Sequence, residues 1–340
     1  MINVGVIGLG FMGRTHVAAV AQAARDGLPC RLAALCDRDP SRFTLEGGPA
    51  GNLRTAGERG AIHDAAAART ATDPRELLSD PAIDAVIICT HTETHVDLAL
   101  AALAAGKHVL IEKPVALRST DVARVARAAR EARRLAMPAM CMRFWPGWAW
   151  LRNVIATRDF GPVRSAVFQR LGCPPTWSSF YADVSRSGGP LFDLHVHDSD
   201  FIRHALGEPS EVVSTGSVQH VTTLYRFESG PAHVVGEGGL DHTPGFGFRM
   251  RYVVALERAT ADFDLGRTPT LLLHREGRSD PVDLPALSAF DAEVRHFIEQ
   301  CAGPTPGAEP PRATIDDAVA TTRLLEAEQR SLQSGRPERV

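Results

Sequence analysis

The glycine-rich turn at residues 8–13 constrains the fold more than any other feature of the sequence. Residues 2–7 read INVGVI, a short apolar run that predicts a buried strand. The run breaks at GLGFMG, and the alanine-rich residues 14–24 predict a helix. Strand, G-x-G-x-x-G and helix, in this order, bring backbone amides close to a pyrophosphate at a helix N-terminus. The sequence therefore predicts a dinucleotide-binding turn formed by Gly8, Gly10, Phe11, Met12 and Gly13.

Length and composition bound the class of protein. The 340 residues, 44% apolar and 23% charged, are those of an ordinary globular protein with room for two domains. A net charge of -3 gives no reason to expect a nucleic-acid or membrane partner. The chain enters its first strand without a signal-like segment, and its six cysteines form no C-x-x-C pair. We therefore expect a cytoplasmic protein without disulfides.

Strands and helices alternate through the first half of the chain. Residues 31–36, 84–89 and 107–111 predict strands, and residues 73–78, 96–105 and 119–135 predict helices. This alternation implies a parallel sheet with right-handed crossovers, which binds ligands at the carboxyl ends of its strands. Polar residues that follow the predicted strands should meet at that edge as cofactor contacts: Asp37, Arg38, Thr90, His91, His95, Glu112 and Lys113.

Asp37 bears on the choice of cofactor. An acidic residue about 20 positions after the glycine turn takes the ribose hydroxyls of the adenosine half and repels a 2′-phosphate, which favours NAD. Arg38 could instead accept that phosphate, so NADP is the alternative. Two structural interpretations remain open: Asp37 as the cap of a turn before Pro40, and His95 as a helix cap.

Lys113 stands between Glu112 and Pro114 at a predicted strand end. Proline restricts its own backbone and that of the residue before it, which aims the ammonium. A lysine in a cleft can donate to a substrate hydroxyl and stabilise the oxyanion that develops as hydride leaves carbon. A surface turn with a salt bridge fits the same residues equally well.

In the second half of the chain, the alternation of strands and helices gives way to mostly strand-like runs. Strand-like runs at residues 163–171, 211–218, 221–227, 232–237, 248–256 and 271–274 have few helices between them. They predict an α/β domain with a mostly antiparallel open sheet. We expect a first domain over 1–142 and a second over 143–340, with closing helices at 289–301 and 314–332 that pack back on the first domain. A strand at 139–142 is also predicted, and residues 41–70 are expected to hold a loop around 47–52 and a helix over 62–69.

The segment GGPLFDLHVHDSD at residues 188–200 carries candidate acid–base chemistry. A helix beginning near Pro190 places Asp193 and His197 four residues apart on one face. A carboxylate beside an imidazole raises its basicity and suits a general base. A buried polar network that only holds the helix remains an alternative. A metal site through His195 and His197 is disfavoured because this spacing diverges on a helix, so we expect no metal.

Three motifs together resemble the glucose-fructose oxidoreductase/inositol dehydrogenase/rhizopine catabolism (Gfo/Idh/MocA) family of NAD(P)-dependent oxidoreductases. They are GLGFMG at residues 8–13, AGKHVLIEKP at 105–114 and GGPLFDLHVHD at 188–198. The resemblance implies an N-terminal Rossmann domain with a doubly wound parallel sheet, followed by an α/β domain whose open sheet often mediates oligomers. It also implies Lys113 as the catalytic lysine and Asp193 with His197 as the pair near the reacting carbon.

The sequence departs from the family pattern at two motif positions. His91 follows Thr90 where proline or asparagine is usual, and His195 replaces a frequent glycine, which predicts an added polar group in the substrate pocket. Arg143 and Trp145 are further candidate substrate contacts, whereas core packing is the safer interpretation of the tryptophans at 145, 148 and 150.

The resemblance implies hydride transfer between NAD(P) and a hydroxyl-bearing carbon of a sugar or polyol by a homodimer or homotetramer. The alternatives are an NAD-dependent glycosidase of the same family and a non-catalytic dinucleotide-binding sensor. A sensor would have no need of both Lys113 and His197.

Overall fold

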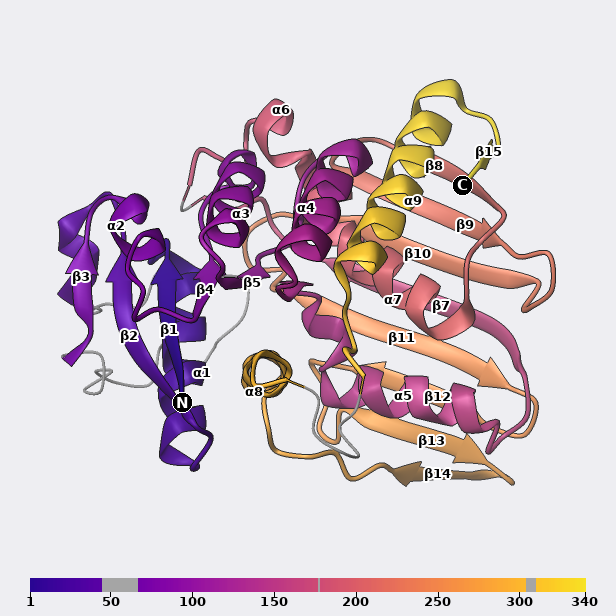
Figure 1. Cartoon of the computed structure of the whole chain (residues 1–340). Helices are drawn as coiled ribbons and strands as arrows, with labels where there is room; N and C mark the ends of the chain where they lie inside the picture. Colours follow the sequence, from indigo (N-terminus) through magenta and orange to yellow (C-terminus); the bar gives the residue numbers. More distant parts are fainter. Residues whose placement is uncertain (45–66, 177, 304–309) are drawn as a thin grey trace. The chain divides into compact units, whose positions relative to one another are not determined.

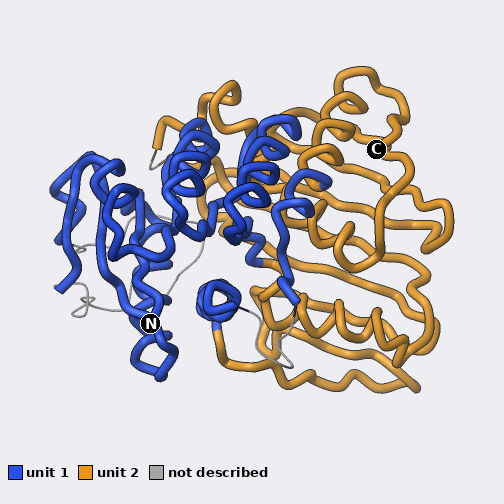
Figure 2. The backbone as a smooth tube through the Cα atoms, in the orientation of Figure 1, with its two compact units in different colours: residues 1–141, 288–320 blue, residues 142–287, 321–340 orange. Residues whose placement is uncertain are grey.

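The computed structural model describes residues 1–44, 67–176, 178–303 and 310–340, which form two compact units (Figure 2). Unit 1 comprises residues 1–141 and 288–320, and unit 2 comprises residues 142–287 and 321–340. Most of the loop and helix expected within residues 41–70 lies outside the described residues. The assignment of separate functions to the two predicted domains stays a prediction.

Unit 1 is built on a six-stranded sheet in the order β3-β2-β1-β4-β5-β6 (Figure 1). Every neighbouring pair is parallel, which confirms the predicted doubly wound architecture. The strands are β1 (Ile2–Ile7), β2 (Cys30–Cys36), β3 (Arg69–Ala71), β4 (Ala85–Ile88), β5 (His108–Ile111) and β6 (Ala136–Pro138). The order reverses between β1 and β4, and doubly wound sheets bind their ligands at such a switch point.

The helices of unit 1 follow the local signals of the sequence. Asp73 caps α2 by accepting from the backbone N–H of Arg75, as its position before a proline predicts. Gly106 takes a positive φ of 76° just beyond α3. The α-helices are α1 (Phe11–Arg25), α2 (Pro74–Leu78), α3 (His95–Ala104), α4 (Ser119–Ala132) and α8 (Ala289–Cys301), and short 3₁₀ turns cover Pro40–Thr44 and Thr92–Thr94. Helix α8 packs on α1.

Unit 2 contains a nine-stranded sheet in the order β14-β13-β12-β11-β7-β10-β9-β8-β15. All its neighbouring pairs are antiparallel except β7 with β10, so the predicted mostly antiparallel sheet is confirmed. The strands are β7 (Val163–Leu171), β8 (Glu211–Gly216), β9 (His220–Arg226), β10 (His233–Gly239), β11 (Arg249–Leu256), β12 (Thr260–Asp264), β13 (Leu271–Arg275), β14 (Arg278–Pro281) and β15 (Glu338–Arg339).

Helices cover one face of this nine-stranded sheet (Figure 1). They are α5 (Pro146–Thr157), a π-helical turn over Leu191–His195, α7 (Val196–Leu206) and the later part of α9 (Ile315–Ser334); the short α6 (Val184–Ser187) precedes the π turn. The strands alternate between buried and partly exposed residues, because successive side chains point to opposite faces. Trp148 is fully buried on the helical side and packs edge-on against Tyr252 and Phe263, at ring-centroid distances of 4.9 and 4.6 Å. Core packing is confirmed for Trp148.

Some predicted elements are wrong or missing. The strand expected at 139–142 is replaced by β6 and a 3₁₀ turn over Cys141–Arg143. Helix α5 and strands β3, β12 and β14 were not predicted. All six cysteines are free thiols. Among the described residues, no helix combines the length and the apolar character needed to cross a membrane.

Candidate active site

The glycine turn joins β1 to α1, and backbone contacts require two of its glycines. Gly8 has a φ of +90°, and a Cβ on it would lie 2.7 Å from the carbonyl oxygen of Cys89. A Cβ on Gly13 would lie 1.8 Å from the carbonyl oxygen of Gly8. Neither position tolerates a side chain without movement of backbone. The turn is thus locked between the ends of β1 and β4, at the switch point of the sheet.

Gly10 plays a different part in the same turn. It is the N-cap of α1, and among the described residues no side chain caps the first amides of that helix. The first turn also contains no acidic residue. A Cβ on Gly10 would meet only Nη1 of Arg42, at 3.8 Å. The free amides and the open approach suit an anion such as a pyrophosphate, with Phe11 and Met12 as the first helical residues beside it.

Asp37 is buried at the end of β2, and both of its carboxylate oxygens accept from backbone amides. Oδ2 lies 2.7 Å from the N–H nitrogen of Leu9 and Oδ1 lies 2.9 Å from that of Asp39. Asp37 therefore ties the glycine turn to the turn after β2, the capping role that the sequence left open. Each carboxylate oxygen can accept more than one hydrogen bond, so the predicted ribose contact is compatible with this role and stays a prediction.

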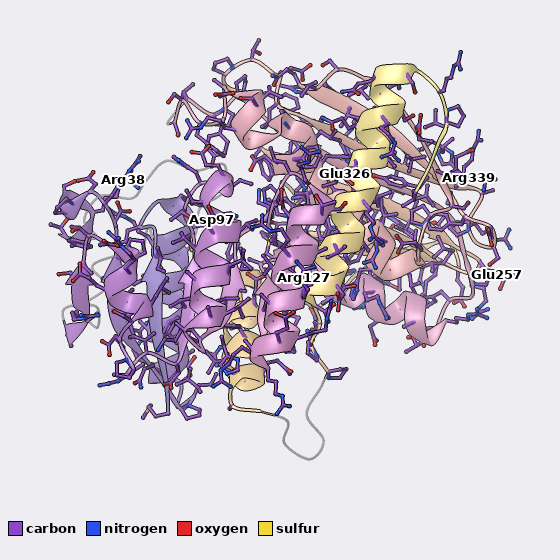
Figure 3. All side chains as sticks on the ribbon, turned by 45° about the horizontal axis from the view of Figure 1, so that its top comes forward. Arg38, Asp97, Arg127, Glu257, Glu326 and Arg339 are labelled. Atoms are coloured by element: carbon purple, nitrogen blue, oxygen red, sulfur yellow. The ribbon has the colours of Figure 1, made fainter. Side chains whose placement is uncertain are left out.

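Two arginines follow Asp37. The predicted phosphate contact, Arg38, is exposed and its side chain extends away from the ribbon (Figure 3). Arg42 lies beside the glycine turn, with Nη1 3.8 Å from a Cβ placed on Gly10 and 3.6 Å from Oδ2 of Asp37, and its side chain is 46% exposed. Arg42 was not predicted from the sequence, because the 3₁₀ turn over Pro40–Thr44 that carries it has no periodic pattern.

The turn after β4 is organised around a buried histidine. His95 is 1% exposed, and its Nδ1 and Nε2 each lie 3.0 Å from a backbone carbonyl oxygen, those of Pro114 and Thr90. Burial lowers the pKa of His95 despite these two contacts. The structure thus gives His95 a structural contact that links the turns after β4 and β5. The cofactor contacts predicted for Thr90, His91 and His95 stay predictions.

The Glu112-Lys113-Pro114 turn is held by a contact with His16 of α1. Oε1 of Glu112 lies 2.7 Å from Nε2 of His16, and Oε2 accepts from the backbone N–H of Lys113 at 3.1 Å. The Lys113–Pro114 peptide bond is cis. Glu112 is 6% exposed, whereas Lys113 is partly exposed. A buried carboxylate thus holds the backbone from which Lys113 projects. The roles predicted for Glu112 and Lys113 at the cofactor stay predictions.

A second buried carboxyl group lies near Glu112. Glu293 of α8 is fully buried, and neither of its carboxyl oxygens has a hydrogen-bond partner among the described residues. Burial, with the neighbouring charge of Glu112, raises the pKa of Glu293 well above its ordinary value. Sequence reasoning missed this residue, because a glutamate in an amphipathic helix ordinarily faces water.

The segment predicted to carry acid–base chemistry begins with a π-helical turn over Leu191–His195, which leads directly into α7. Residues 187–202 are all described, and within them Asp193 and His197 are the two positions that are not buried. The predicted pair is thereby set apart from its neighbours. Its exposure favours chemistry with a ligand, although the pairing itself stays a prediction.

The polar neighbours of that pair form a buried network. Arg170 makes a bidentate ion pair with Asp198 at 3.0 and 2.9 Å, and Ser199 donates to Glu328 of α9 at 2.9 Å. Tyr225 also donates to Glu328, at 3.0 Å. The alternative of a buried network therefore describes these neighbours, which fix α7 against the sheet.

Two candidate substrate contacts belong to this network. Arg143 is 3% exposed and forms a bidentate ion pair with Asp200 at 2.8 and 2.7 Å. His195 is fully buried, with Nε2 3.1 Å from the hydroxyl of Tyr225. Both side chains are enclosed by protein in this network, and the substrate contacts predicted for Arg143 and His195 stay predictions. Trp145, the N-cap of α5, is partly exposed, and its substrate contact stays a prediction.

A parallel sheet with this strand order, an uncapped helix behind a locked glycine turn and a carboxylate at the end of β2 define a dinucleotide-binding protein of the Rossmann class. Comparisons extend this assignment to both units. Residues 2–140 match the oxidoreductase family with an NAD-binding Rossmann fold, Gfo/Idh/MocA, and residues 148–253 match the Gfo/Idh/MocA C-terminal domain. The chain belongs to the Gfo/Idh/MocA family of NAD-binding oxidoreductases.

Individual relatives are distant. The chain is 27% identical to the myo-inositol 2-dehydrogenase of Thermotoga maritima over 98% of this chain and 97% of the relative. It is 29% identical to the scyllo-inositol 2-dehydrogenase (NAD(+)) of Bacillus subtilis over 78% and 80%. Among solved structures, an NAD binding oxidoreductase from Klebsiella pneumoniae superposes with a TM-score of 0.81 at 26% identity, covering 100% of this chain and 99% of that one. Levoglucosan dehydrogenase in complex with NADH and levoglucosan has the same TM-score and coverage at 22% identity, which shows the fold alone.

Proposed function

We propose that this chain is an NAD-dependent dehydrogenase that oxidises a hydroxyl-bearing carbon of a sugar or polyol. The observation that carries the proposal is the selective exposure of Asp193 and His197 on an otherwise buried segment of an NAD-binding oxidoreductase. Two distant relatives that match most of this chain are named as inositol dehydrogenases, which supports a polyhydroxylated substrate.

The residues of unit 1 fit a dinucleotide. Gly10 leaves the approach to the amides of α1 open, and Asp37 lies beside them with lone pairs suited to ribose hydroxyls. When bound, NAD supplies the acceptor for the substrate hydride. The fixed glycine turn between β1 and α1 would hold the pyrophosphate of that cofactor.

In this proposal, Lys113 stabilises the developing charge and His197 accepts the proton. Lys113 would donate a hydrogen bond to the substrate hydroxyl and stabilise the negative charge that develops on its oxygen. His197 would accept the hydroxyl proton, with Asp193 raising the basicity of its imidazole. Glu112 would keep the backbone of Lys113 in place through its 3.1 Å hydrogen bond.

The test is to incubate the protein with NAD and each member of a panel of inositols and sugars, and to measure NADH formation by its absorbance. Lys113→Ala should abolish turnover while NADH affinity stays within a few-fold. His197→Ala should lower kcat by about 10²–10⁴-fold, the usual contribution of a positioned base. His233→Ala is the matched control, because His233 is an exposed residue of β10. Unchanged turnover in either of the first two variants would remove that residue from catalysis.

Two alternative outcomes are distinguishable in the same assay. Cleavage of glycosides without net NADH release would favour the NAD-dependent glycosidase. Tight NADH binding with no reaction across the panel, together with unchanged NADH binding in Lys113→Ala and His197→Ala, would favour a non-catalytic sensor.

The lysine content of the chain offers an independent readout. The sequence contains two lysines, Lys107 and Lys113. Lys107 is 6% exposed, and its ammonium donates to the carbonyl oxygens of Asp80 and Ile83, both at 2.7 Å. Acetylation under native conditions, read by peptide mass spectrometry, should therefore report on Lys113 among the lysines. NADH should slow that acetylation if Lys113 lies beside the bound cofactor, and an unchanged rate would place it elsewhere.

We also propose that the protein acts in the cytoplasm as a homodimer or homotetramer. Six free cysteines fit a reducing compartment. Val167 and Val253, each 38% exposed, lie on neighbouring strands of the nine-stranded sheet, on the face without helices. Light scattering coupled to size-exclusion chromatography measures the assembly, and a monomer at micromolar concentration would contradict it.

A further inference from the structure

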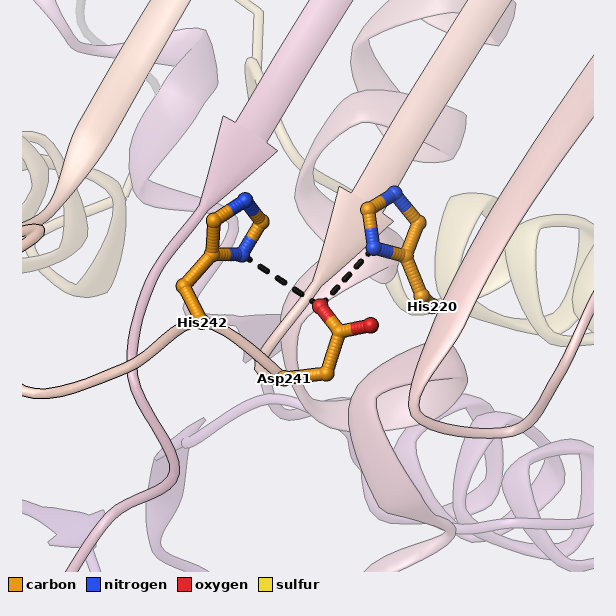
Figure 4. A group of neighbouring side chains, drawn as sticks. All are labelled: His220, Asp241 and His242. Atoms are coloured by element: carbon orange, nitrogen blue, oxygen red, sulfur yellow. Dashed lines mark hydrogen bonds and ion pairs between the residues drawn. The ribbon is translucent and has the colours of Figure 1, made fainter.

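A cluster of side chains of the types that ligate metal ions lies in unit 2, outside the residues assigned to hydride transfer. In the described part of the chain, the structure brings together one group of three such residues: His220, Asp241 and His242 (Figure 4). One ligand atom from each lies within 4.8 Å of the others. His220 begins β9, and the other two follow the end of β10. The group is therefore built by the pairing of two strands.

Backbone hydrogen bonds fix the segments that carry these residues. Gly239 pairs with His220 in the antiparallel register of β9 and β10. The N–H of Leu240 donates to the carbonyl of Gln219 at 2.9 Å, and the N–H of His242 donates to the carbonyl of Gly172, just beyond β7, at 3.3 Å. The three side chains thus converge from a scaffold of paired strands.

The separations are close to those of a tetrahedral zinc site. Oδ1 of Asp241 lies 2.9 Å from Nδ1 of His220 and 3.3 Å from Nδ1 of His242. Ligand atoms about 2.0–2.1 Å from a tetrahedral ion lie about 3.3 Å from one another. The Asp241–His242 separation already has this value. The His220–Asp241 pair would widen by about 0.4 Å to admit the ion.

A second carboxylate orients His220. Nε2 of His220 lies 2.9 Å from Oε1 of Glu237, whose Oε2 accepts from the side-chain amide of Gln169 at 2.6 Å. When Nε2 carries the proton for Glu237, the lone pair of Nδ1 points at Asp241, which offers lone pairs as well. The two lone pairs then repel each other, and a cation bound between them would turn this repulsion into attraction. Carboxylate–histidine–metal arrangements use the same geometry.

His242 supplies an independent observation. Its Nδ1 is enclosed by protein and has no hydrogen-bond partner among the described residues, although it faces Oδ1 of Asp241. Its ring stacks on Phe246 at a centroid distance of 4.0 Å, which fixes the plane of the imidazole. A ring nitrogen that makes no hydrogen bond and lies 3.3 Å from a carboxylate oxygen is placed to share a metal ion with that carboxylate.

Charge and access favour a divalent ion. With neutral imidazoles, the two carboxylates of Glu237 and Asp241 leave two negative charges in the cluster. Side-chain exposures of 25% for His242, 28% for His220 and 48% for Asp241 leave one side open to solvent. Two imidazoles and a carboxylate form a donor set that zinc accepts, with water or a ligand in the fourth position.

We propose that His220, Asp241 and His242 bind a divalent transition-metal ion, for which Zn²⁺ is the best match, and that Glu237 orients His220. The site joins β9 to the segment that follows β10. None of its ligands is among the residues assigned to hydride transfer, so it is a site additional to the proposed dehydrogenase residues.

The test is metal binding by the full-length chain. After chelator treatment and dialysis, the wild type should take up one equivalent of Zn²⁺ in calorimetry, and Co²⁺ should give the visible absorption bands of tetrahedral coordination. His242→Ala and Asp241→Asn should each abolish stoichiometric uptake. Glu237→Gln should weaken it by about 10–100-fold. His233→Ala, an exposed histidine of the same strand β10, should bind like the wild type.

The control for folding is circular dichroism together with NADH titration of every variant. The Co²⁺ spectrum of the wild type requires no variant, so a variant that fails to fold does not weaken the test. Absence of stoichiometric Zn²⁺ and Co²⁺ binding by the wild type would overturn the proposal and leave His220 as a protonated bridge between two carboxylates. Uptake that is equal in His242→Ala, Asp241→Asn and the wild type would overturn it as well.

Discussion

Gly10 and Gly13 lie three residues apart in the glycine turn, yet alanine at the two positions should produce different defects. A Cβ on Gly13 would stand 1.8 Å from the carbonyl oxygen of Gly8, whereas ordinary contact begins at 3.4 Å. Backbone must therefore separate by about 1.6 Å. A Cβ on Gly10 meets only Nη1 of Arg42 at 3.8 Å, and its φ of −70° is ordinary for alanine. The protein without cofactor should tolerate that substitution.

The magnitudes follow from this difference. Gly13→Ala overpacks the contact between β1 and α1, which should destabilise the fold by about 1–3 kcal/mol. At about 2–4 °C per kcal/mol, the melting temperature should fall by roughly 2–12 °C. An amide–phosphate hydrogen bond requires about 2.7–3.2 Å between heavy atoms, so a 1.6 Å displacement breaks it. Two such bonds, at about 1.5–3 kcal/mol each, correspond to a loss of about 10²–10⁴-fold in NADH affinity.

Gly10→Ala should leave the melting temperature within about 2 °C of the wild type, because an open substitution of this kind changes stability by about 0.5 kcal/mol or less. Its methyl group would nevertheless stand where the pyrophosphate approaches the backbone, so NADH affinity should fall at least tenfold. Differential scanning fluorimetry and NADH fluorescence titration measure the two quantities. Wild-type NADH affinity in Gly10→Ala would refute the assignment of this turn to the pyrophosphate. An unchanged melting temperature in Gly13→Ala would refute the packing argument.

Two further predictions concern groups around the same sheet edge. Arg42→Ala should weaken NADPH binding by about tenfold, a loss of one charge-assisted contact, and leave NADH binding nearly unchanged, with the more distant Arg38→Ala as the control in fluorescence titrations. An equal effect of the two variants would remove Arg42 from phosphate recognition. Glu293→Gln should change how stability depends on pH, because burial raises the pKa of Glu293 in the folded state. This contribution to the free energy of unfolding is complete below the pKa of the unfolded state, about 4.3. It is lost as pH rises towards the pKa of the folded state, by up to about 1.4 kcal/mol per pH unit. Denaturant titrations of both proteins above pH 5 should therefore show Glu293→Gln gaining on the wild type as pH rises, and parallel curves would contradict the buried, protonated carboxyl.

The sequence predicted elements well where one physical signal dominated. Residues 163–171 alternate and 289–301 are amphipathic, and the structure assigns β7 and α8 to those same residues. Strands β3 and β14 carry mostly polar residues and are short, so they form only because a neighbour supplies hydrogen bonds. Helix α5 begins with proline, glycine and tryptophan, which resemble a turn in the sequence. The helix is stabilised by the packing of Trp148 against Tyr252 and Phe263, which are distant in the sequence.

The site separates into local and non-local parts in the same way. The glycine turn and the Glu112-Lys113-Pro114 turn are contiguous motifs, so their geometry follows from neighbours in the sequence. Arg143 resembled a free substrate contact because its partner, Asp200, lies 57 residues away and the bidentate pair exists only once α7 packs. His220 and Asp241 are 21 residues apart and meet because Gly239 registers with His220 across β9 and β10. Gly239 also keeps the approach to His220 open, since a Cβ there would lie 2.6 Å from its Nδ1. The candidate metal site therefore depends on the pairing register of β9 and β10 and not on the spacing of its residues in the sequence. A shift of that register by one residue would remove the site.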